Sequence, residues 1–556
     1  MRTLCRYLLT GLLVLATLPA LAQSFEVART ISTGAAPHGL QRVGDRLYVA
    51  AAGDDRIEVI DLASGEVLER WPAGSSPLDL VASGEGWLVS RFRSRHLASL
   101  DAEGKPAGDP LEVGEGPSLF APRVVNGRAY IVSEMADRLS VIDTTVRKVL
   151  DSYETGKRPY PAAVTERGIL AFVPNRDADS VSVIDLLNER VIREVRVCDA
   201  PSGGALTHHD AAYLVACRGD NRIMAINTAS FAVTGAISDG IGPGPFAVAV
   251  EPHGRFAFAG NADGESVSVF DPETLEPIAE ILVGAQPIAM RIDEGALYVA
   301  NELANTVSVA PIPPWRNPEA AGEPNEVVVL GMIHGTHRTS ARYSLDVLEA
   351  AIRAVDPDIV LTEIPPNRIE AARQGFEATG EVTESRVSVF PEYTEVLFPL
   401  SRAMGFEILP AAAWSEPMND YRSTMLARIR NDPEYRQQWA RHRAARRRFA
   451  RSLGDRADDP FFIHSRRYDE ITREGFAYYD KYFNDLLGPG GWTNINAAHY
   501  ALIDEALDRN AYEGKRVLVT FGASHKYWFL ERLRERDDIR LLDPTPFLEE
   551  AAGATE

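Results

Sequence analysis

The chain has 556 residues, of which 45% are hydrophobic and 25% are charged. This composition allows large buried cores and excludes disordered, collagen-like and small disulfide-stabilised proteins, while the length predicts several domains. The formal charge of −21 excludes a general affinity for nucleic acid or anionic membranes, because both need a basic protein surface.

Residues 1–22 have the pattern of a secretory signal peptide. Arg2 and Arg6 give a basic start, an apolar stretch follows, and the run from Ala20 to Ala22 is a small-residue cleavage signal. The apolar stretch is shorter than the ~20 residues that a membrane-spanning helix needs. We expect a periplasmic or secreted protein whose mature chain begins near Gln23 and contains no integral membrane segment.

A glycine and proline motif recurs through the first half of the chain, as in TGAAP, AGSSP, TGKRP and VGAQP. Each unit also contains four short apolar strands, which is the signature of a propeller blade. The sequence therefore predicts an all-β, seven-bladed propeller over residues 23–312. The repeated prolines, 40–44 residues apart, are Pro37, Pro77, Pro117, Pro159, Pro201, Pro245 and Pro287.

The seventh unit ends near Ile312 and lacks a fourth strand. The segment from Phe25 to Ser32 has the fourth-strand pattern, so we expect it to complete the blade that contains residues 297–309. Such closure removes exposed sheet edges. The repeats resemble the YVTN-type propellers of exported and surface-layer proteins, and this resemblance implies binding of a protein or peptide partner.

Cys198 and Cys217 are the two cysteines of the expected mature chain. They lie at neighbouring strands of one blade, and an even pair in an oxidising compartment favours a disulfide. In the same blade, His208, His209 and Asp210 have metal-ligating side chains. Because this triplet falls between two strands, we interpret it as a solvated turn.

Residues 313–324 form a proline-rich linker, and the pattern then changes. Strands alternate with amphipathic helices over residues 325–552, which predicts a mostly parallel sheet covered by helices on both faces. A largely helical stretch at about 414–512 is too long for an ordinary crossover and is interpreted as an inserted cap. The complete chain is thus predicted to be multidomain, with a propeller followed by an α/β domain.

Metal-ligating side chains follow three of the predicted parallel strands. His334 and His337 lie in GMIHGTH, Glu363 ends DIVLTE, and His525 lies in FGASH. Because ligands bind at the carboxyl ends of strands in such sheets, these side chains are expected to converge. Imidazoles with one carboxylate suit a divalent transition metal such as Zn, Mn or Co, which would activate water for hydrolysis.

The two G-x-x-H motifs that end at His334 and His525, with Glu363 between them, resemble the TraB/Tiki superfamily. This superfamily is similar to the erythromycin-esterase and ChaN-like groups. The resemblance covers about residues 324–550, and its motifs lie at the two ends of that region. It implies a metal-dependent hydrolase in which His334, Glu363 and His525 are catalytic residues and metal ligands. His337 is not required by the family motif, and we expect it to be either a fourth metal ligand or a group that supports the ligands from behind.

One family feature is only half present in the region GGWTNINAAHY. The family carries an Arg-Asn pair before its second G-x-x-H motif, and here Asn494 matches the Asn while Thr493 stands in the Arg position. A guanidinium that steadies a developing oxyanion must then be absent or supplied by Arg338 or Arg473.

Two further motifs allow functional and structural interpretations. GASHK resembles a nucleophile elbow around Ser524, but Lys526 replaces the last glycine, which argues against a serine nucleophile. The arginine-rich segment 436–456 is interpreted as a solvated helix face, with an anion site or a dock for the acidic propeller as the alternatives.

The leading functional hypothesis is an exported metal-dependent peptidase or esterase whose propeller binds a partner or substrate. One alternative is a non-catalytic periplasmic protein that binds a protein, a metal or haem through a degenerate hydrolase-like domain. The other is a metal-free esterase in which a histidine acts as general base. The sequence leaves the substrate, the partner and the oligomeric state open.

Overall fold

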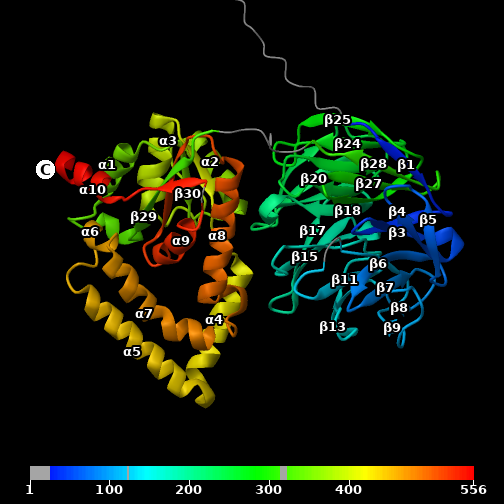
Figure 1. Ribbon diagram of the computed structural model, residues 1–556, viewed down its shortest axis with the longest axis horizontal. Coiled ribbons are helices and arrows are strands. Elements are labelled where there is room, and N and C mark those ends of the chain that lie inside the picture. The colour runs from blue at the N-terminus through cyan, green and yellow to red at the C-terminus, as the bar shows by residue number, and fades with distance from the viewer. Residues whose placement is uncertain (1–24, 122–123, 314–321, 537, 556) are drawn as a thin grey trace, which may run out of the picture.

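The computed structural model describes residues 25–121, 124–313, 322–536 and 538–555, and it contains two domains that lie side by side (Figure 1). The predicted signal peptide and most of the predicted linker lie outside these residues. Over the described ranges, no helix combines the length and the apolar character needed to cross a membrane.

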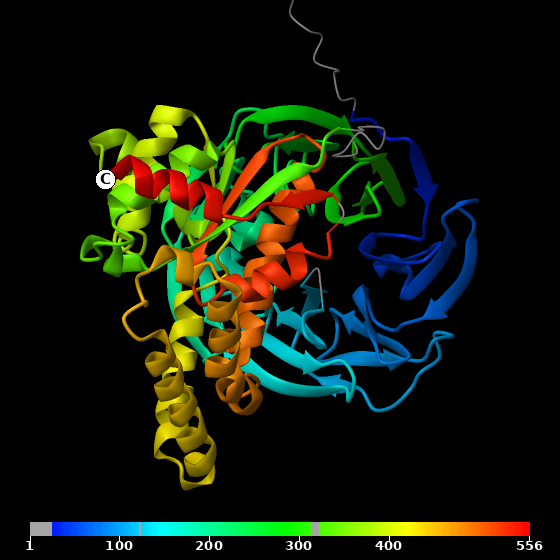
Figure 2. The same ribbon diagram turned by 60° about the vertical axis from the view of Figure 1, so that its left-hand side comes forward.

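The N-terminal domain is the predicted propeller. In the described part of the chain, it has seven antiparallel four-stranded sheets, and the strand order within six of them follows the sequence. Alternate side chains of each strand pack between neighbouring blades, so no blade could bury both of its faces alone. Figure 2 shows the blades as a ring around a central axis.

The strands of the first three complete blades are β2 (Pro37–Val43), β3 (Arg46–Ala51), β4 (Arg56–Asp61), β5 (Val67–Pro72), β6 (Pro77–Ser83), β7 (Gly86–Arg91), β8 (His96–Leu100), β9 (Leu111–Glu112), β10 (Pro117–Phe120), β11 (Arg128–Ser133), β12 (Arg138–Asp143) and β13 (Lys148–Glu154). The next three blades contain β14 (Ala163–Val164), β15 (Leu170–Asn175), β16 (Ser180–Asp185), β17 (Arg190–Arg196), β18 (Pro201–Leu206), β19 (Ala212–Cys217), β20 (Arg222–Asn227), β21 (Val233–Ile237), β22 (Pro245–Val250), β23 (Ala257–Asn261), β24 (Ser266–Phe270) and β25 (Pro277–Leu282).

The last blade closes the ring as predicted. It combines β26 (Pro287–Asp293), β27 (Ala296–Asn301) and β28 (Thr306–Pro311) with β1 (Arg29–Ser32) from the start of the chain. β1 pairs antiparallel with β28. The closing strand thus protects an edge that would otherwise be open to pairing with another chain.

The repeated glycine has a direct structural cause, which Gly156 illustrates. Its N–H donates to Oγ of Ser182 at 3.2 Å, and a Cβ built on it would lie 2.7 Å from Cγ of Asn175. Asn175 in turn donates to Ser182, so the inner edge of the blade closes around the glycine. The same contact between glycine and asparagine recurs at Gly242 and Gly284.

Cys198 and Cys217 form the predicted disulfide, with their Cα atoms 5.8 Å apart. Cys217 ends β19, and Cys198 lies in the connection that precedes β18. Both sulfurs are buried among apolar side chains that include Tyr213 and Phe172. The bridge therefore joins two neighbouring segments of a single blade.

The C-terminal domain contains a five-stranded, fully parallel sheet in the order β31-β30-β32-β29-β33. Successive residues of β29 face opposite sides: Val328 and Leu330 belong to one core, and Val327 and Val329 to the other. Burial of both faces explains the continuous apolar runs of these strands. The strands are β29 (Asn325–Met332), β30 (Ile359–Thr362), β31 (Glu407–Pro410), β32 (Arg516–Gly522) and β33 (Ile539–Leu541).

Helices cover both faces of this sheet, as predicted. The α-helices are α1 (Leu345–Val355), α2 (Pro366–Thr379), α3 (Phe398–Met404), α4 (Glu416–Asn431), α5 (Arg436–Leu453), α6 (Pro460–Ile463), α7 (Arg466–Phe483), α8 (Trp492–Arg509), α9 (Lys526–Leu533) and α10 (Thr545–Thr555). Shorter helical turns relevant to the sites below are η3 (His208–Asp210) and η4 (His334–Arg338), and η5 (Glu392–Leu397) is a π-helix.

Helices α4 to α8 occupy the predicted insertion between β31 and β32. α5 and α7 project from the sheet, and α5 lies away from the propeller in both views (Figures 1 and 2). The arginine-rich segment is therefore not docked on the propeller. The guanidinium of Arg446 in α5 lies over the rings of Phe449 and Phe476, so at least one arginine of this segment packs against aromatic side chains.

Helices α2, α4 and α8 lie on the side of the C-terminal domain that faces the propeller (Figure 1). Polar contacts join the two domains there. The guanidinium of Arg167 in the propeller donates to the carbonyl oxygens of Ala413 at 3.1 Å and Pro489 at 2.8 Å. Asn367 donates to Oγ1 of Thr228 at 3.0 Å. A set of apolar residues from both domains completes the contact, with Met418 and Ile495 packed into a propeller core.

Replacing Cys198 and Cys217 together by Ala should lower the free energy of unfolding by about 3 kcal/mol, because the bridge restricts the unfolded chain. Denaturant titration of the wild type with and without a reductant measures the loss. The double variant is the control, since a reductant should leave its midpoint unchanged. Two free thiols in the non-reduced mature protein would contradict the assignment.

Candidate functional site

Three of the predicted site residues follow neighbouring strands of the parallel sheet. His334 lies two residues after β29, Glu363 directly follows β30, and His525 lies three residues after β32. Met332 is paired in register with Gly522, so β29 and β32 end at the same level. The fold thus brings the three segments to one edge of the sheet.

Glu363 is anchored by backbone hydrogen bonds. Its Oε2 accepts the N–H of Gly522 at 2.9 Å, and its own N–H donates to Oη of Tyr393 at 2.9 Å. Nε2 of His334 lies 4.0 Å from the same Oε2. The carboxylate is therefore held between the end of β32 and the imidazole of His334.

His525 is buried, and one side chain fixes its tautomer. Nδ1 of His525 lies 2.7 Å from Oδ1 of Asn496, whose Nδ2 donates to the carbonyl of Trp492 at 2.7 Å. The Asn496 amide is oriented by that bond, so its oxygen accepts and Nδ1 of His525 carries the proton. Burial lowers the pKa of His525 against the opposing charge of Glu363. Nε2 is left with a lone pair.

His334 is held by a carboxylate that is completely buried. Its Nδ1 lies 2.6 Å from Oε1 of Glu392, which has no exposed surface. Burial alone would lower the pKa of His334, but the bond to Glu392 and the charges of Glu363 and Glu392 outweigh it and raise the pKa. His334 also has a left-handed φ of 50°, which is costly for a non-glycine residue and typical of functional positions.

The three side chains influence one another through charge, but their donor atoms are not all in close contact. Both Glu363 and His334 influence the pKa of His525 through charge. Nevertheless, over the residues that the structure describes, the donor atoms of the trio do not all lie within 4.8 Å of one another. The trio therefore does not form a closed set of ligands in this structure.

The hydrogen bonds of His337 favour the second of its two predicted roles, that of a group behind the ligands, over that of a fourth ligand. Its Nε2 accepts the N–H of Ile333 at 3.1 Å, and its Nδ1 lies 2.8 Å from the carbonyl of Tyr343 and donates to it. Both ring nitrogens are thus occupied within the loop. His337 is only 1% exposed, and it fixes the course of the backbone that carries His334.

The three candidate oxyanion groups are engaged elsewhere. Arg338 pairs with Glu395 and Arg473 with Glu531, and all four side chains are well exposed. Asn494 donates to the carbonyl of Gly488 at 2.8 Å and accepts from Asn484. In addition, Thr493 bonds to Asp480. These contacts stabilise the start of α8 and the surface, and each of these groups is engaged with a partner outside the trio of His334, Glu363 and His525.

The elbow motif also has a structural explanation. Lys526 is 2% exposed, and its Nζ pairs with Asp469 of α7. A buried ion pair therefore replaces the glycine that a nucleophile elbow requires. This geometry gives no support to Ser524 as a nucleophile.

Glu392 and Asn496 are site residues that sequence reasoning missed. Glu392 begins a π-helix, a rare element that is frequent at functional sites, and it shares a buried face with Tyr393 and Val396. Asn496 lies one helical turn after Trp492 and one turn before His499, so all three share a face of α8. In both helices, a carboxylate or amide residue lies among mainly apolar buried residues, and this pattern could have indicated a functional side chain.

Gly522 leaves the space between the imidazole and the carboxylate. A Cβ at this position would lie 2.8 Å from Nε2 of His334 and 3.4 Å from Oε2 of Glu363. The ring of His334 is tied to Glu392 and cannot easily retreat. Any larger residue here would therefore fill the centre of the candidate site.

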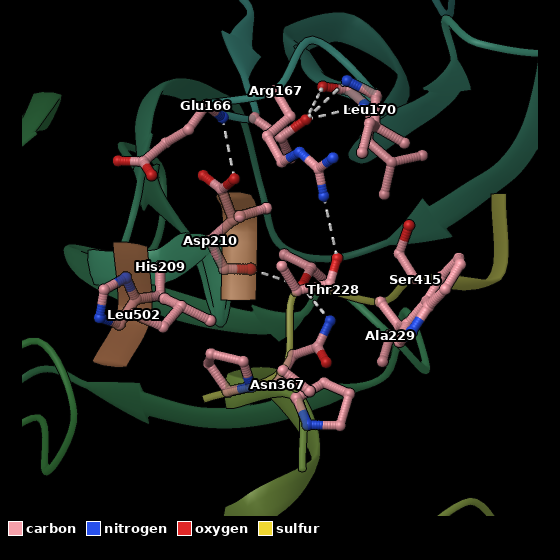
Figure 3. A pocket seen from close by; sticks show the side chains of 18 of the residues that line it. Glu166, Arg167, Leu170, His209, Asp210, Thr228, Ala229, Asn367, Ser415 and Leu502 are labelled. Carbon is pink, nitrogen blue, oxygen red and sulfur yellow. Dashed lines mark hydrogen bonds between the residues drawn. The ribbon is translucent and has the colours of Figure 1, made fainter. Parts of the chain in front are cut away.

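Two pockets that share lining residues lie between Glu363 and the propeller. Glu363 lines a pocket of about 230 Å³, and a pocket of about 390 Å³ lies between the domains (Figure 3). Figure 3 shows Arg167 and His209 of the propeller and Asn367 of the C-terminal domain around the larger pocket. The residues common to both pockets are Pro365, Arg368, Ala412, Trp414, Ser415 and Glu416.

Comparisons with known proteins show no match to any family model and no match to a curated protein. Among solved structures, the hydrazine synthase of Kuenenia stuttgartiensis aligns with a TM-score of 0.45 and 16% sequence identity. The alignment covers 51% of this chain and 97% of that one.

In metal-free protein, Glu392→Gln should lower the pKa of His334, because a neutral amide no longer stabilises the imidazolium. NMR titration of the histidine side chains measures the shift. The pair stabilises the fold fully below about pH 6.5, and this contribution fades as pH rises through the raised pKa. Glu395→Gln, three residues further along, is the control. An unchanged His334 titration in Glu392→Gln would contradict the assignment.

Proposed function

We propose that the protein is a metal-dependent hydrolase of peptide or ester bonds, with its reactive centre at His334, Glu363 and His525. The observation that carries the proposal is the pair of oriented imidazoles. Each has its Nδ1 bound to a side-chain oxygen and its Nε2 available, and a carboxylate lies beside His334. We also propose that the protein is exported, on the basis of the signal-peptide pattern of residues 1–22.

The residue types of the donor set suit a divalent transition metal, and a bound ion would have to draw their donor atoms closer together than they lie in this structure. Nε2 of His334, Nε2 of His525 and the carboxylate of Glu363 are the ligands that zinc, manganese or cobalt would take, with room for water. Glu392 and Asn496 supply the carboxylate and amide partners that usually orient metal-binding histidines. The missing side chain of Gly522 lets Nε2 of His334 and Oε2 of Glu363 both approach the end of β32, which places the two donor groups on the same side of this strand end.

When bound, the ion would acidify a water molecule and polarise a scissile carbonyl. The protein side chains have separate tasks. Glu392 keeps the Nδ1 proton of His334 in place, and Asn496 does the same for His525. Trp492 stacks on the ring of His525 with centroids 4.9 Å apart, so one wall of the site is apolar and excludes water.

The neighbouring pockets support an extended substrate and a role for the propeller in binding it. A chain that occupies the pocket beside Glu363 can continue past Arg368 and Trp414 into the larger pocket between the domains. Thr165, Arg167 and Phe231 of the propeller line that larger pocket. We propose that the propeller thereby recognises part of a peptide or peptide-like substrate.

One observation favours the second candidate, a metal-free esterase. The buried Glu392 and His334 form a carboxylate–imidazole pair of the kind that acts as general base, with the pKa of His334 raised. The open spacing of the three side chains is compatible with that chemistry as well. A non-catalytic binding protein is the third possibility and predicts no turnover.

A panel of fluorogenic peptides and p-nitrophenyl esters tests the proposal on full-length mature protein. Chelator should abolish turnover, and Zn²⁺, Mn²⁺ or Co²⁺ should restore it. His334→Ala and His525→Ala should each lower kcat/KM by more than about 100-fold, beyond the usual effect of losing an outer hydrogen-bond partner. His96→Ala, in the propeller, is the control.

The alternatives give different results in the same assays. Chelator-resistant turnover that still needs His334 would identify the metal-free esterase. Turnover that survives replacement of both His334 and His525 would contradict the proposed centre. Absence of turnover and of metal binding at this site would leave the binding protein.

A second test uses the space at Gly522. Gly522→Ala should lower kcat/KM at least about tenfold, because the new methyl group contacts Nε2 of His334 and the tied ring can respond only by losing its alignment. The melting temperature should change little. Gly335→Ala, in the loop of His334 and with nothing near its added Cβ, is the matched control. Equal activity of both variants would contradict the placement of the site.

A further inference from the structure

A second group of metal-ligating side chains lies between the two domains. It consists of His208 and His209 on η3 of the propeller and Glu505 on α8. Nε2 of His208 is 2.5 Å from Oε1 of Glu505, and Nε2 of His209 is 3.3 Å from its Oε2. The side chains of the two histidines are only 10% and 19% exposed. The expectation of a solvated turn is therefore wrong.

The backbone directs both imidazoles to the same place. His209 and Asp210 have left-handed φ values of 56° and 55°, which non-glycine residues seldom adopt. As a result, the two successive rings lie on one side of the turn, with their centroids 3.6 Å apart. Gly254 leaves space for His208, because a Cβ there would lie 2.5 Å from the Cβ of His208. The fold thus gathers two imidazoles at the domain boundary.

One hydrogen bond of His208 fixes its tautomer and shows which ring nitrogen can act as a ligand. Nδ1 lies 2.7 Å from the carbonyl of Pro252, so Nδ1 donates and Nε2 of the neutral ring carries a lone pair. This buried Nε2 has no hydrogen-bond partner of acceptable geometry, although the carboxylate of Glu505 is beside it. A lone pair and a carboxylate oxygen repel each other at this distance. A cation between them removes the repulsion.

Glu505 is also oriented as a ligand would be. Arg509, one turn further along α8, donates to Oε1 at 3.1 Å and to the carbonyl of His253 at 2.7 Å. The guanidinium therefore holds one carboxylate oxygen and the propeller loop that also binds His208. The other oxygen, Oε2, is left to face His209.

We propose that His208, His209 and Glu505 bind a divalent transition metal ion of the zinc class, which joins the propeller to α8. The site is separate from the proposed hydrolase centre and does not depend on it. Two imidazoles and one carboxylate are an established ligand set for zinc, with water in the fourth position. His209 and Glu505 both line the pocket of Figure 3, where such a water has room.

The geometry is close to the requirement. Ligand atoms at about 2.1 Å from a tetrahedral ion are about 3.4 Å apart. The separation of Nε2 of His209 from Oε2 of Glu505, 3.3 Å, is close to this distance, and the contact of His208 with Oε1 needs to open by less than about 1 Å. All three donor atoms lie within 4.8 Å of one another, which the atoms at the sheet edge do not achieve.

The metal content of tag-free, full-length mature protein tests the proposal. In the His334→Ala/His525→Ala background, which lacks the two imidazoles of the hydrolase centre, dialysis against Zn²⁺ should leave about one ion per chain. Adding His208→Ala and His209→Ala, or Glu505→Gln alone, should remove it. Glu535→Gln, on an exposed glutamate of the same domain, is the control and should retain the ion.

Three measurements keep the result interpretable. Zn²⁺ should raise the melting temperature of the background protein but not that of its Glu505→Gln derivative. Zinc absorption spectra should show nitrogen and oxygen ligands at about 2.0–2.2 Å. Arg509→Gln should weaken zinc affinity about tenfold. Equal zinc content with and without Glu505→Gln, or a background protein that retains no zinc, would overturn the proposal and leave a protonated histidine as the cation.

Because the background lacks His334 and His525, the two metal proposals fail separately. Wild-type protein with about two ions supports both sites. One ion that is lost on Glu505→Gln supports only the site between the domains. One ion that is lost on His334→Ala/His525→Ala supports only the hydrolase centre and overturns the site described above.

Discussion

The parallel pairing of β29 with β32 is the constraint on which the C-terminal site depends. These strands are separated by more than 180 residues, yet Met332 and Gly522 are paired in register. The pairing places the loop of His334 next to the turn of His525, and β30 on the other side of β32 adds Glu363. The sheet fixes the two ends of the long helical insertion, and within the insertion α8 is also tied to this edge through the bond from Asn496 to His525.

A layer of buried polar groups behind the edge determines how the imidazoles point. Glu392 and Asn496 come from a π-helix and from α8, on opposite sides of the sheet, and each binds the Nδ1 of one histidine. A buried carboxylate is costly unless it is paired. The π-helix must therefore keep the Glu392 carboxylate within reach of Nδ1 of His334. α8 has a second task, since Glu505 and Arg509 contact the propeller from the same helix. Domain docking and orientation of His525 therefore depend on one element.

Periodic features were predictable from sequence, and contacts between distant segments were not. The seven regularly spaced prolines predicted the number of blades. The missing fourth strand of the last repeat predicted closure by β1, because each repeat must stack on an equivalent neighbour. Likewise, strands followed by His334, Glu363 and His525 indicated one sheet edge. The sequence could not decide between the two predicted roles of His337, because both of its hydrogen-bond partners are backbone groups, which a motif does not display. The burial of His208 escaped prediction because its partner, Glu505, lies in the other domain, almost 300 residues away.

Closure of the ring by β1 has a consequence for how the chain folds during synthesis. β1 ends at Ser32, but its partner β28 begins at Thr306. At the usual synthesis rate of about 5–20 residues per second, roughly 15–55 s pass between the synthesis of β1 and that of its partner strand β28. During that time, the edge of the first blade and the growing edge of the array both remain unpaired. The nascent propeller therefore has a long period of exposure to misassembly, which ends only when the chain has passed residue 311.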